Sequence, residues 1–199
     1  MRSIYKIVVC SLLTLSITSC EKDLLEKEQY QKEIYLIGAY NRVWTTEVSY
    51  SNEEVKTYFT VSSSGTLALD RDVNVKMKIN EELVDIYNKK YWTVLNEDKY
   101  YKSLDTDLYS IPSLENTVIK HAEGISAEVP VLIKTASLKI DQSYVIPVEI
   151  ESTTGYPISE SGYKMLILLK LKNDYSGSYQ MSGHTTLDRK STRLNSSHL

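Results

Sequence analysis

Cysteine is almost missing from this 199-residue chain, which contains only Cys10 and Cys20. Two cysteines near the N-terminus cannot build the disulfide framework that stabilises many small exported domains. A metal site is not indicated either, because such sites need several ligands at short spacing and the chain has three histidines. His121 and His184 lie far apart in the sequence. The folded part must therefore be stabilised by an apolar core.

Patterns typical of enzymes are also absent. The chain has seven glycines, and none forms a phosphate-binding loop or the turn of a nucleophilic serine. Carboxylates do occur in pairs, as glycoside hydrolysis requires, but each pair fits a loop or a helix N-terminus better. The sequence therefore predicts no catalytic residue and no cofactor. The three pairs are Glu53 with Glu54, Glu81 with Glu82, and Asp105 with Asp107.

The N-terminus has the pattern of an export signal. Arg2 and Lys6 precede an apolar stretch over residues 7–15 that is too short to span a bilayer, which takes about 20 residues. Residues 15–20 then resemble a bacterial lipobox, in which small residues precede a cysteine that becomes lipidated. This predicts a signal peptide over residues 1–19 and a lipid anchor on Cys20. The small or aliphatic residues before that cysteine are Ile17, Thr18 and Ser19.

Two other readings of this segment stay open, an ordinary secretory signal and a buried N-terminal strand. Residues 20–31 form a charged tether, and Glu21, Lys22 and Asp23 resemble the signal that directs Bacteroidetes lipoproteins to the cell surface. We therefore expect an outer-membrane protein exposed at the surface, with the periplasmic face as the alternative. A solvated spacer would explain the same three charges.

The other end of the chain resembles foreign sequence. Residues 188–198 match the in-frame translation of a common sequencing-library adapter, so we expect residues 188–199 to be an artefact and the gene to be truncated. Without this tail and the signal peptide, 18 Lys and Arg face 25 Asp and Glu, a net charge of −7. This acidic balance argues against nucleic acid as a partner.

Between the ends, apolar and polar residues alternate as in half-buried antiparallel strands. The strands are expected at residues 34–38, 55–61, 73–79, 125–134, 144–151 and 164–172. One helix is predicted over residues 80–91, because Asn80 can cap it and apolar residues follow at helical spacing. The fold class is therefore all-β, and a single Ig-like β-sandwich with one short inserted helix is expected over residues 32–173.

Several segments in this order resemble a known domain: VNVKMKINEELVDIYNKKY from Val73, YKSLDTDLYSI from Tyr101, QSYVIPVEIES from Gln142, and LILLKLKN. They are similar to the N-terminal domain, formerly classed as of unknown function, of a family of Bacteroidetes surface lipoproteins. In that family the domain precedes family-18 endo-glycosidase or laminin-G-like modules. The resemblance implies glycan handling beside outer-membrane polysaccharide uptake proteins, with any catalysis in a later domain. Residues 174–187 resemble the start of a second β-domain.

Tyrosine dominates the aromatic residues, with sixteen against a single phenylalanine. Sugars stack on flat aromatic faces, and four rings in segments expected to be loops or to flank loops are candidates for such contacts. Packing in the core is the alternative for each of them. The candidates are Trp44, Trp92, Tyr100 and Tyr101.

Three function classes remain open. The first is a non-catalytic module that binds glycan or acts as a spacer at the cell surface. The second is the N-terminal module of a truncated glycoside hydrolase, and the third is a structural or adhesin-like surface protein.

Overall fold

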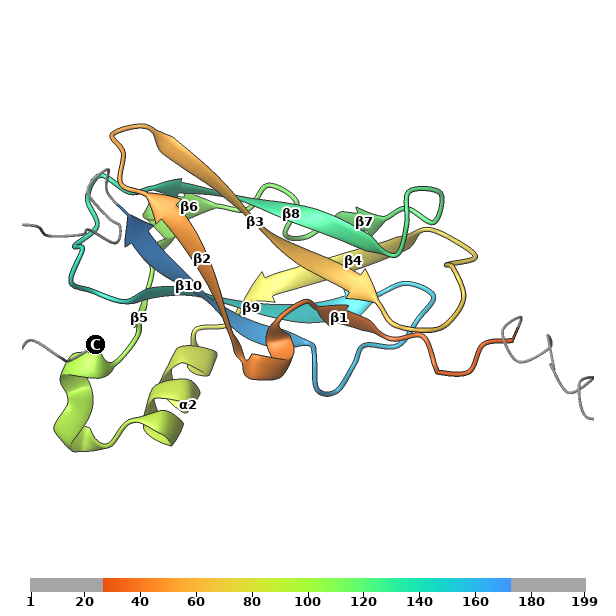
Figure 1. Cartoon of the computed structure of the whole chain (residues 1–199), viewed down its shortest axis with the longest axis horizontal. Coiled ribbons are helices and arrows are strands. Elements are labelled where there is room, and N and C mark those ends of the chain that lie inside the picture. Colours follow the sequence, from red (N-terminus) through yellow and green to blue (C-terminus); the bar gives the residue numbers. More distant parts are fainter. Residues whose placement is uncertain (1–26, 173–199) are drawn as a thin grey trace, which may run out of the picture.

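The computed structural model of the chain describes residues 27–172, which form two β-sheets packed face to face (Figure 1). The predicted signal peptide, the lipobox, Cys20, His184 and residues 174–199 lie outside the described residues. The first sheet contains, in spatial order, β1 (Ile34–Leu36), β3 (Glu54–Ser63), β8 (Ser126–Lys134) and β6 (Tyr109–Ser110). The second contains β2 (Val43–Ser49), β10 (Lys164–Lys172), β9 (Tyr144–Thr153), β4 (Val73–Ile79) and β7 (Thr117–Ile119), with β5 (Lys102–Ser103) also paired to β9.

The sandwich confirms the all-β prediction and the strands with the clearest alternation. β4 and β10 have the predicted bounds, and β3, β8 and β9 differ from theirs by one or two residues at either end. Along β4, Val73, Val75 and Met77 are buried while the residues between them are exposed. The short strand β6 lies in the YKSLDTDLYSI segment that carries the family resemblance, whereas β5, β7 and the whole of β2 were not predicted.

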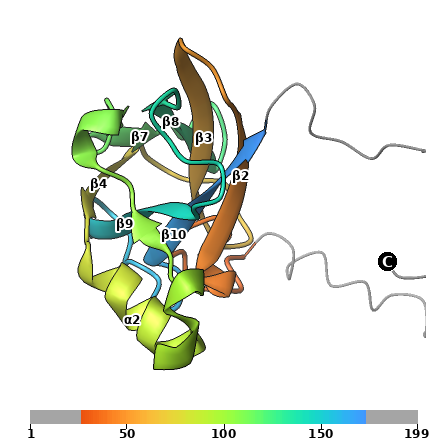
Figure 2. The same cartoon turned by 90° about the vertical axis from the view of Figure 1, so that its left-hand side faces the viewer.

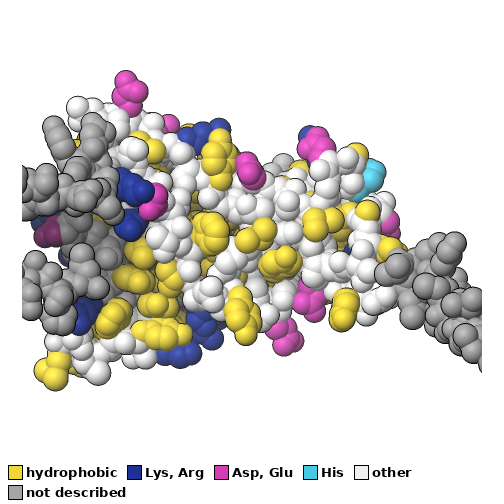
Figure 3. Space-filling model, in the orientation of Figure 1, with side chains coloured by type: hydrophobic (Ala, Val, Ile, Leu, Met, Phe, Trp, Pro, Cys, Tyr) yellow, Lys and Arg dark blue, Asp and Glu magenta, His cyan; other side chains and the backbone are white. Residues whose placement is uncertain are grey.

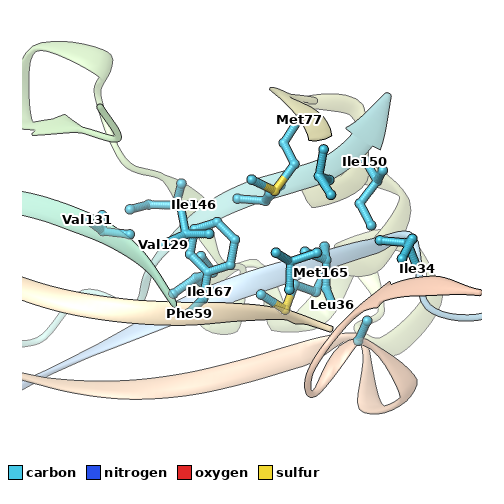
Figure 4. Packing of buried hydrophobic residues seen from close by; sticks show 14 of the residues in the cluster. Ile34, Leu36, Phe59, Met77, Val129, Val131, Ile146, Ile150, Met165 and Ile167 are labelled. Atoms are coloured by element: carbon cyan, nitrogen blue, oxygen red, sulfur yellow. The ribbon is translucent and has the colours of Figure 1, made fainter. Parts of the chain in front are cut away.

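The core lies between the two sheets. Both sheets contribute side chains to it, and Figure 4 shows them meeting in the interior. Phe59 of β3 is 2% exposed and Ile167 of β10 is 1% exposed. Two buried methionines, Met77 and Met165, fill the same layer, as flexible thioethers do in irregular gaps. This layer replaces the disulfides that the chain lacks.

Pro147 lies in β9, a central strand, although a proline is expected at an edge or a bulge. β10 covers one side of β9 along 144–149. On the other side, β5 pairs as far as Val145 and β4 pairs from Val148 onward, so Pro147 lies in the gap between them. No strand therefore pairs with Pro147 on that side, and the N–H that proline lacks leaves no strand partner without its hydrogen bond. Its carbonyl oxygen still accepts a hydrogen bond from the Asn80 amide at 3.1 Å.

The predicted helix is α2 (Glu82–Tyr91), and it covers the outer face of the six-stranded sheet. Figure 2 shows it on the side of that sheet away from β3 and β8. Asn80 begins it as predicted, because its side-chain oxygen accepts a hydrogen bond from the Glu82 amide at 3.1 Å. Leu83 and Val84 pack against Val145 and Leu166 of the sheet, forming a second, smaller core.

Candidate functional site

A groove of about 250 Å³ lies where α2 meets the sheet, and we call it the α2 groove. Figure 3 shows hydrophobic side chains gathered over this part of the surface, with Lys and Arg side chains beside them. One wall comes from the segment before β2, one from α2, and the floor from the start of β10. The lining residues are Ala39, Tyr40, Arg42, Leu83, Ile86, Tyr87, Glu160, Ser161, Lys164, Met165 and Leu166.

The first wall is a tight turn whose backbone is unusual. The 3-10 helix η3 (Ala39–Asn41) is flanked by Gly38 at φ 89° and Arg42 at φ 63°. Glycine adopts such angles freely, whereas arginine pays about 1–2 kcal/mol. Arg42 is the only non-glycine residue with a positive φ among the described residues. A strained residue that lines a groove is a reason to suspect a function for its side chain.

The second wall carries a stack of tyrosines, which we call the tyrosine stack. Tyr87 of α2 lies parallel to Tyr101, with ring centroids 5.3 Å apart, and its other neighbour is Tyr91 at 4.4 Å. Burial raises the pKa of Tyr87, so this phenol stays neutral. Asn88 fixes the arrangement, because its side chain bonds both the amide and the carbonyl of Tyr101, at 3.0 and 2.9 Å.

The four rings predicted to stack on sugars do not form one platform. Trp44 lies in β2 and not in a loop, so the expected location was wrong. Side chains along β2 point alternately to the two faces of the sheet. Val43 is on the face that α2 covers, so Trp44 is on the opposite face, together with Val48 of the core between the sheets. Its ring packs over Gly38, where an added Cβ would lie 2.5 Å from the ring. Trp44 therefore faces away from Tyr101.

Trp92, Tyr100 and Tyr101 lie outside helices and strands, in the loop or loop-flanking positions expected for them. Trp92 follows α2 directly, and the ammonium of Lys99 lies over its ring at 5.7 Å from the centroid. The indole N–H of Trp92 is buried and has no partner among the described residues. A sugar could reach this face only by displacing Lys99. Tyr100 ends the 3-10 helix η4 (Val94–Lys99) and is half-buried.

The sequence analysis missed the residues that line the α2 groove. Tyr40 is 87% exposed at its rim, and Arg42, Glu160 and Lys164 bring the charged groups. These residues are about 120 positions apart in the chain, so no local pattern joins them. Gly38 was the one available signal, because a glycine at the end of a strand marks a tight turn.

The predicted carboxylate pairs lie at the ends of strands and helices or in turns. Glu54 begins β3, Glu81 precedes α2, and the Asp105 side chain accepts a hydrogen bond from the Asp107 amide in the turn η5 (Thr106–Leu108). No group of three metal-ligating side chains occurs within residues 27–172. No helix in that range is long and apolar enough to cross a membrane.

The histidine among the described residues is hydrogen-bonded to a carboxylate at the surface. His121 Nδ1 lies 2.6 Å from Asp72 Oδ1, and the His121 amide donates to the same oxygen at 3.0 Å. These hydrogen bonds lower the pKa of the Asp72 carboxyl. The pair is near the start of β4, whereas α2 follows the end of that strand.

Comparison with known families decides which family this sandwich belongs to. A family model described as an N-terminal domain matches residues 30–157, more than half of the chain. The chain belongs to this family. A second model, for the C-terminal region, matches residues 163–198 and so includes β10 and the stretch that resembles adapter. β10 nevertheless pairs with β2 and β9 inside the sandwich.

Solved structures with the same fold come from Bacteroides species. A multidomain B. ovatus protein that includes DUF1735 has a TM-score of 0.55 at 20% identity, over 69% of this chain and 43% of that one. An auxiliary nutrient binding protein from B. thetaiotaomicron has a TM-score of 0.56 at 16% identity, over 70% and 47%. EndoBT-3987 of the same species, solved with a Man5GlcNAc product, has a TM-score of 0.50 at 20% identity, over 69% and 30%.

These likenesses confirm the family resemblance and the β-sandwich. The chain spans less than half the length of each of these three proteins. No curated protein matches the chain in sequence.

Proposed function

We propose that this domain is a non-catalytic glycan-binding module and that the α2 groove is its binding site. The observation that carries the proposal is the composition of the groove. It combines an exposed ring at the rim, an apolar floor and three charged side chains, which is the mixture that sugar recognition uses. Apolar C–H faces of a sugar can pack on the ring of Tyr40, while hydroxyls bond to the charged groups.

The related proteins support a role with nutrients or glycans. One is described as an auxiliary nutrient binding protein, and another was solved with an oligosaccharide product. We further propose that Cys20 carries a lipid and holds the module at the outer membrane, beside polysaccharide uptake proteins. Labelled palmitate should enter the wild-type protein and not a Cys20→Ala variant. Absence of label from the wild type would refute the anchor.

The binding proposal is tested with the chain lacking residues 1–20, on a glycan array and on insoluble polysaccharides. Tyr40→Ala should weaken binding by about 1–2 kcal/mol through loss of ring stacking and its buried area. The matched control is Tyr58→Ala, which removes another exposed tyrosine, on β3 in the other sheet. Equal losses in both variants, or no glycan retained by the wild type, would contradict the proposal.

A second function has one observation in its favour. EndoBT-3987 contains this fold as less than a third of its length, so the domain also occurs within larger enzymes. In that case the present chain is the N-terminal module of a glycoside hydrolase, and the α2 groove would hold substrate for a later domain. Sequencing the gene beyond the codon for Leu187 separates this function from a structural or adhesin-like role.

A further inference from the structure

The charged groups of the α2 groove are free to bind a ligand. Among residues 27–172, the side chain of Arg42 forms no hydrogen bond or ion pair, and the side chain of Glu160 forms none either. The other arginine in that range, Arg71, is bound to Asp70 at 3.0 Å.

Lys164 is similarly available. Its ammonium lies over the ring of Tyr163, 4.8 Å from the centroid. The residue opposite it on β9 is Glu149, whose carboxylate already accepts a hydrogen bond from Asn80 at 2.5 Å and lies 3.8 Å from the ammonium of Lys78. Lys164 is therefore left facing the groove with Glu160 as the one carboxylate in the lining.

The two cations come from neighbouring backbone segments in the lining of the groove. The carbonyl of Arg42 accepts a hydrogen bond from the Leu166 amide at 2.8 Å. Lys164 is two positions before Leu166 on the same face of β10, which places their Cα atoms about 7 Å apart. Both positive residues therefore belong to the lining of one groove, where an anionic group would be attracted to each of them.

We infer that the α2 groove binds an acidic saccharide whose carboxylate pairs with Arg42. This inference rests on the proposed glycan-binding function and names its ligand class. A guanidinium forms two parallel hydrogen bonds with a carboxylate, which suits a uronic acid or a related acidic sugar. Lys164 adds a second positive charge, and Glu160 accepts hydrogen bonds from sugar hydroxyls.

The strain at Arg42 supports the same conclusion. A glycine would adopt φ 63° without steric strain, whereas the arginine is held there in spite of that strain.

The test compares acidic polysaccharides with their carboxyl-reduced forms, in which each uronate becomes a neutral sugar. The probes are polygalacturonate, alginate and hyaluronan, beside neutral mannan and xylan, with the chain lacking residues 1–20. We expect at least one acidic probe to bind and to lose roughly 10- to 100-fold in affinity on carboxyl reduction. Added salt should weaken its binding, unlike that of a neutral glycan.

Arg42→Gln should cause a loss of the same size, whereas Arg71→Gln, the matched control, should bind as the wild type does. Arg42→Lys should retain part of the affinity, because lysine keeps the positive charge but cannot form the two parallel hydrogen bonds of a guanidinium. Binding of neutral probes alone would overturn the acidic-ligand inference and leave the glycan-binding function standing. Binding of no probe would overturn both. Acidic binding that survives Arg42→Gln would place the site elsewhere.

Discussion

Replacing Arg42 by glycine should stabilise the domain while removing its proposed ligand contact. The wild-type residue is held at φ 63°, which costs an L-amino acid about 1–2 kcal/mol. Glycine relieves this strain but loses more conformational freedom on folding, by about 0.5–1 kcal/mol. The difference leaves a net gain of about 0.5–1 kcal/mol, or roughly 1–4 °C in the melting temperature of a domain this size.

The control is Arg42→Ala, which loses the same guanidinium and keeps the strained backbone. Its midpoint in urea or thermal unfolding should be no higher than that of the wild type, and Arg42→Gly should lie above both. If the glycine variant is no more stable than the alanine variant, the backbone at this turn is not strained. The argument from strain to function would then fail.

Three further changes test other parts of the structure. Asn88→Ala should destabilise the domain by about 1–3 kcal/mol in urea unfolding, because it leaves the backbone amide and carbonyl of Tyr101 without hydrogen-bond partners. An unchanged midpoint would show that water replaces both bonds. Met77→Asp should prevent folding, since it puts a charge in a position that is 1% exposed, and a native circular dichroism spectrum would contradict this. The lowered pKa of Asp72 gives stability that is present above the ordinary aspartate pKa of about 3.9 and is lost as the pH falls through the lowered value. Asp72→Asn should therefore flatten the loss of stability as the pH falls below about 4. An unaltered acid unfolding profile would show that the hydrogen bonds between Asp72 and His121 contribute nothing.

The strands could be predicted where one face of the strand is buried and the other is exposed to solvent. β4 shows this most clearly, because Val73, Val75 and Met77 alternate with exposed residues and the pattern fixes both ends. β2 was missed for the opposite reason. Its residues are mostly exposed or half-buried, and it pairs in parallel with β10, more than a hundred residues later. An edge strand of this kind has no local signature.

The α2 groove could not be predicted because its walls meet only in the folded chain. Helical spacing correctly placed Leu83, Ile86 and Tyr87 on one helix. It could not show that Ile86 lines the groove together with the turn before β2, or that Arg42 in that turn has a left-handed backbone conformation. The candidate rings were chosen because they seemed to lie in loops, and that criterion selected Trp44, which lies on the inward side of β2. Whether the four rings contact a ligand stays a prediction.

The most direct test of the account is to map the bound glycan by amide chemical shifts. The chain lacking residues 1–20, labelled with ¹⁵N, is titrated with the polysaccharide fragment that the array retains. The account predicts that the largest shifts fall in residues 39–42, 83–87 and 160–166, which line the α2 groove. Shifts gathered instead around Trp92 and Tyr100, or along β3, would contradict it.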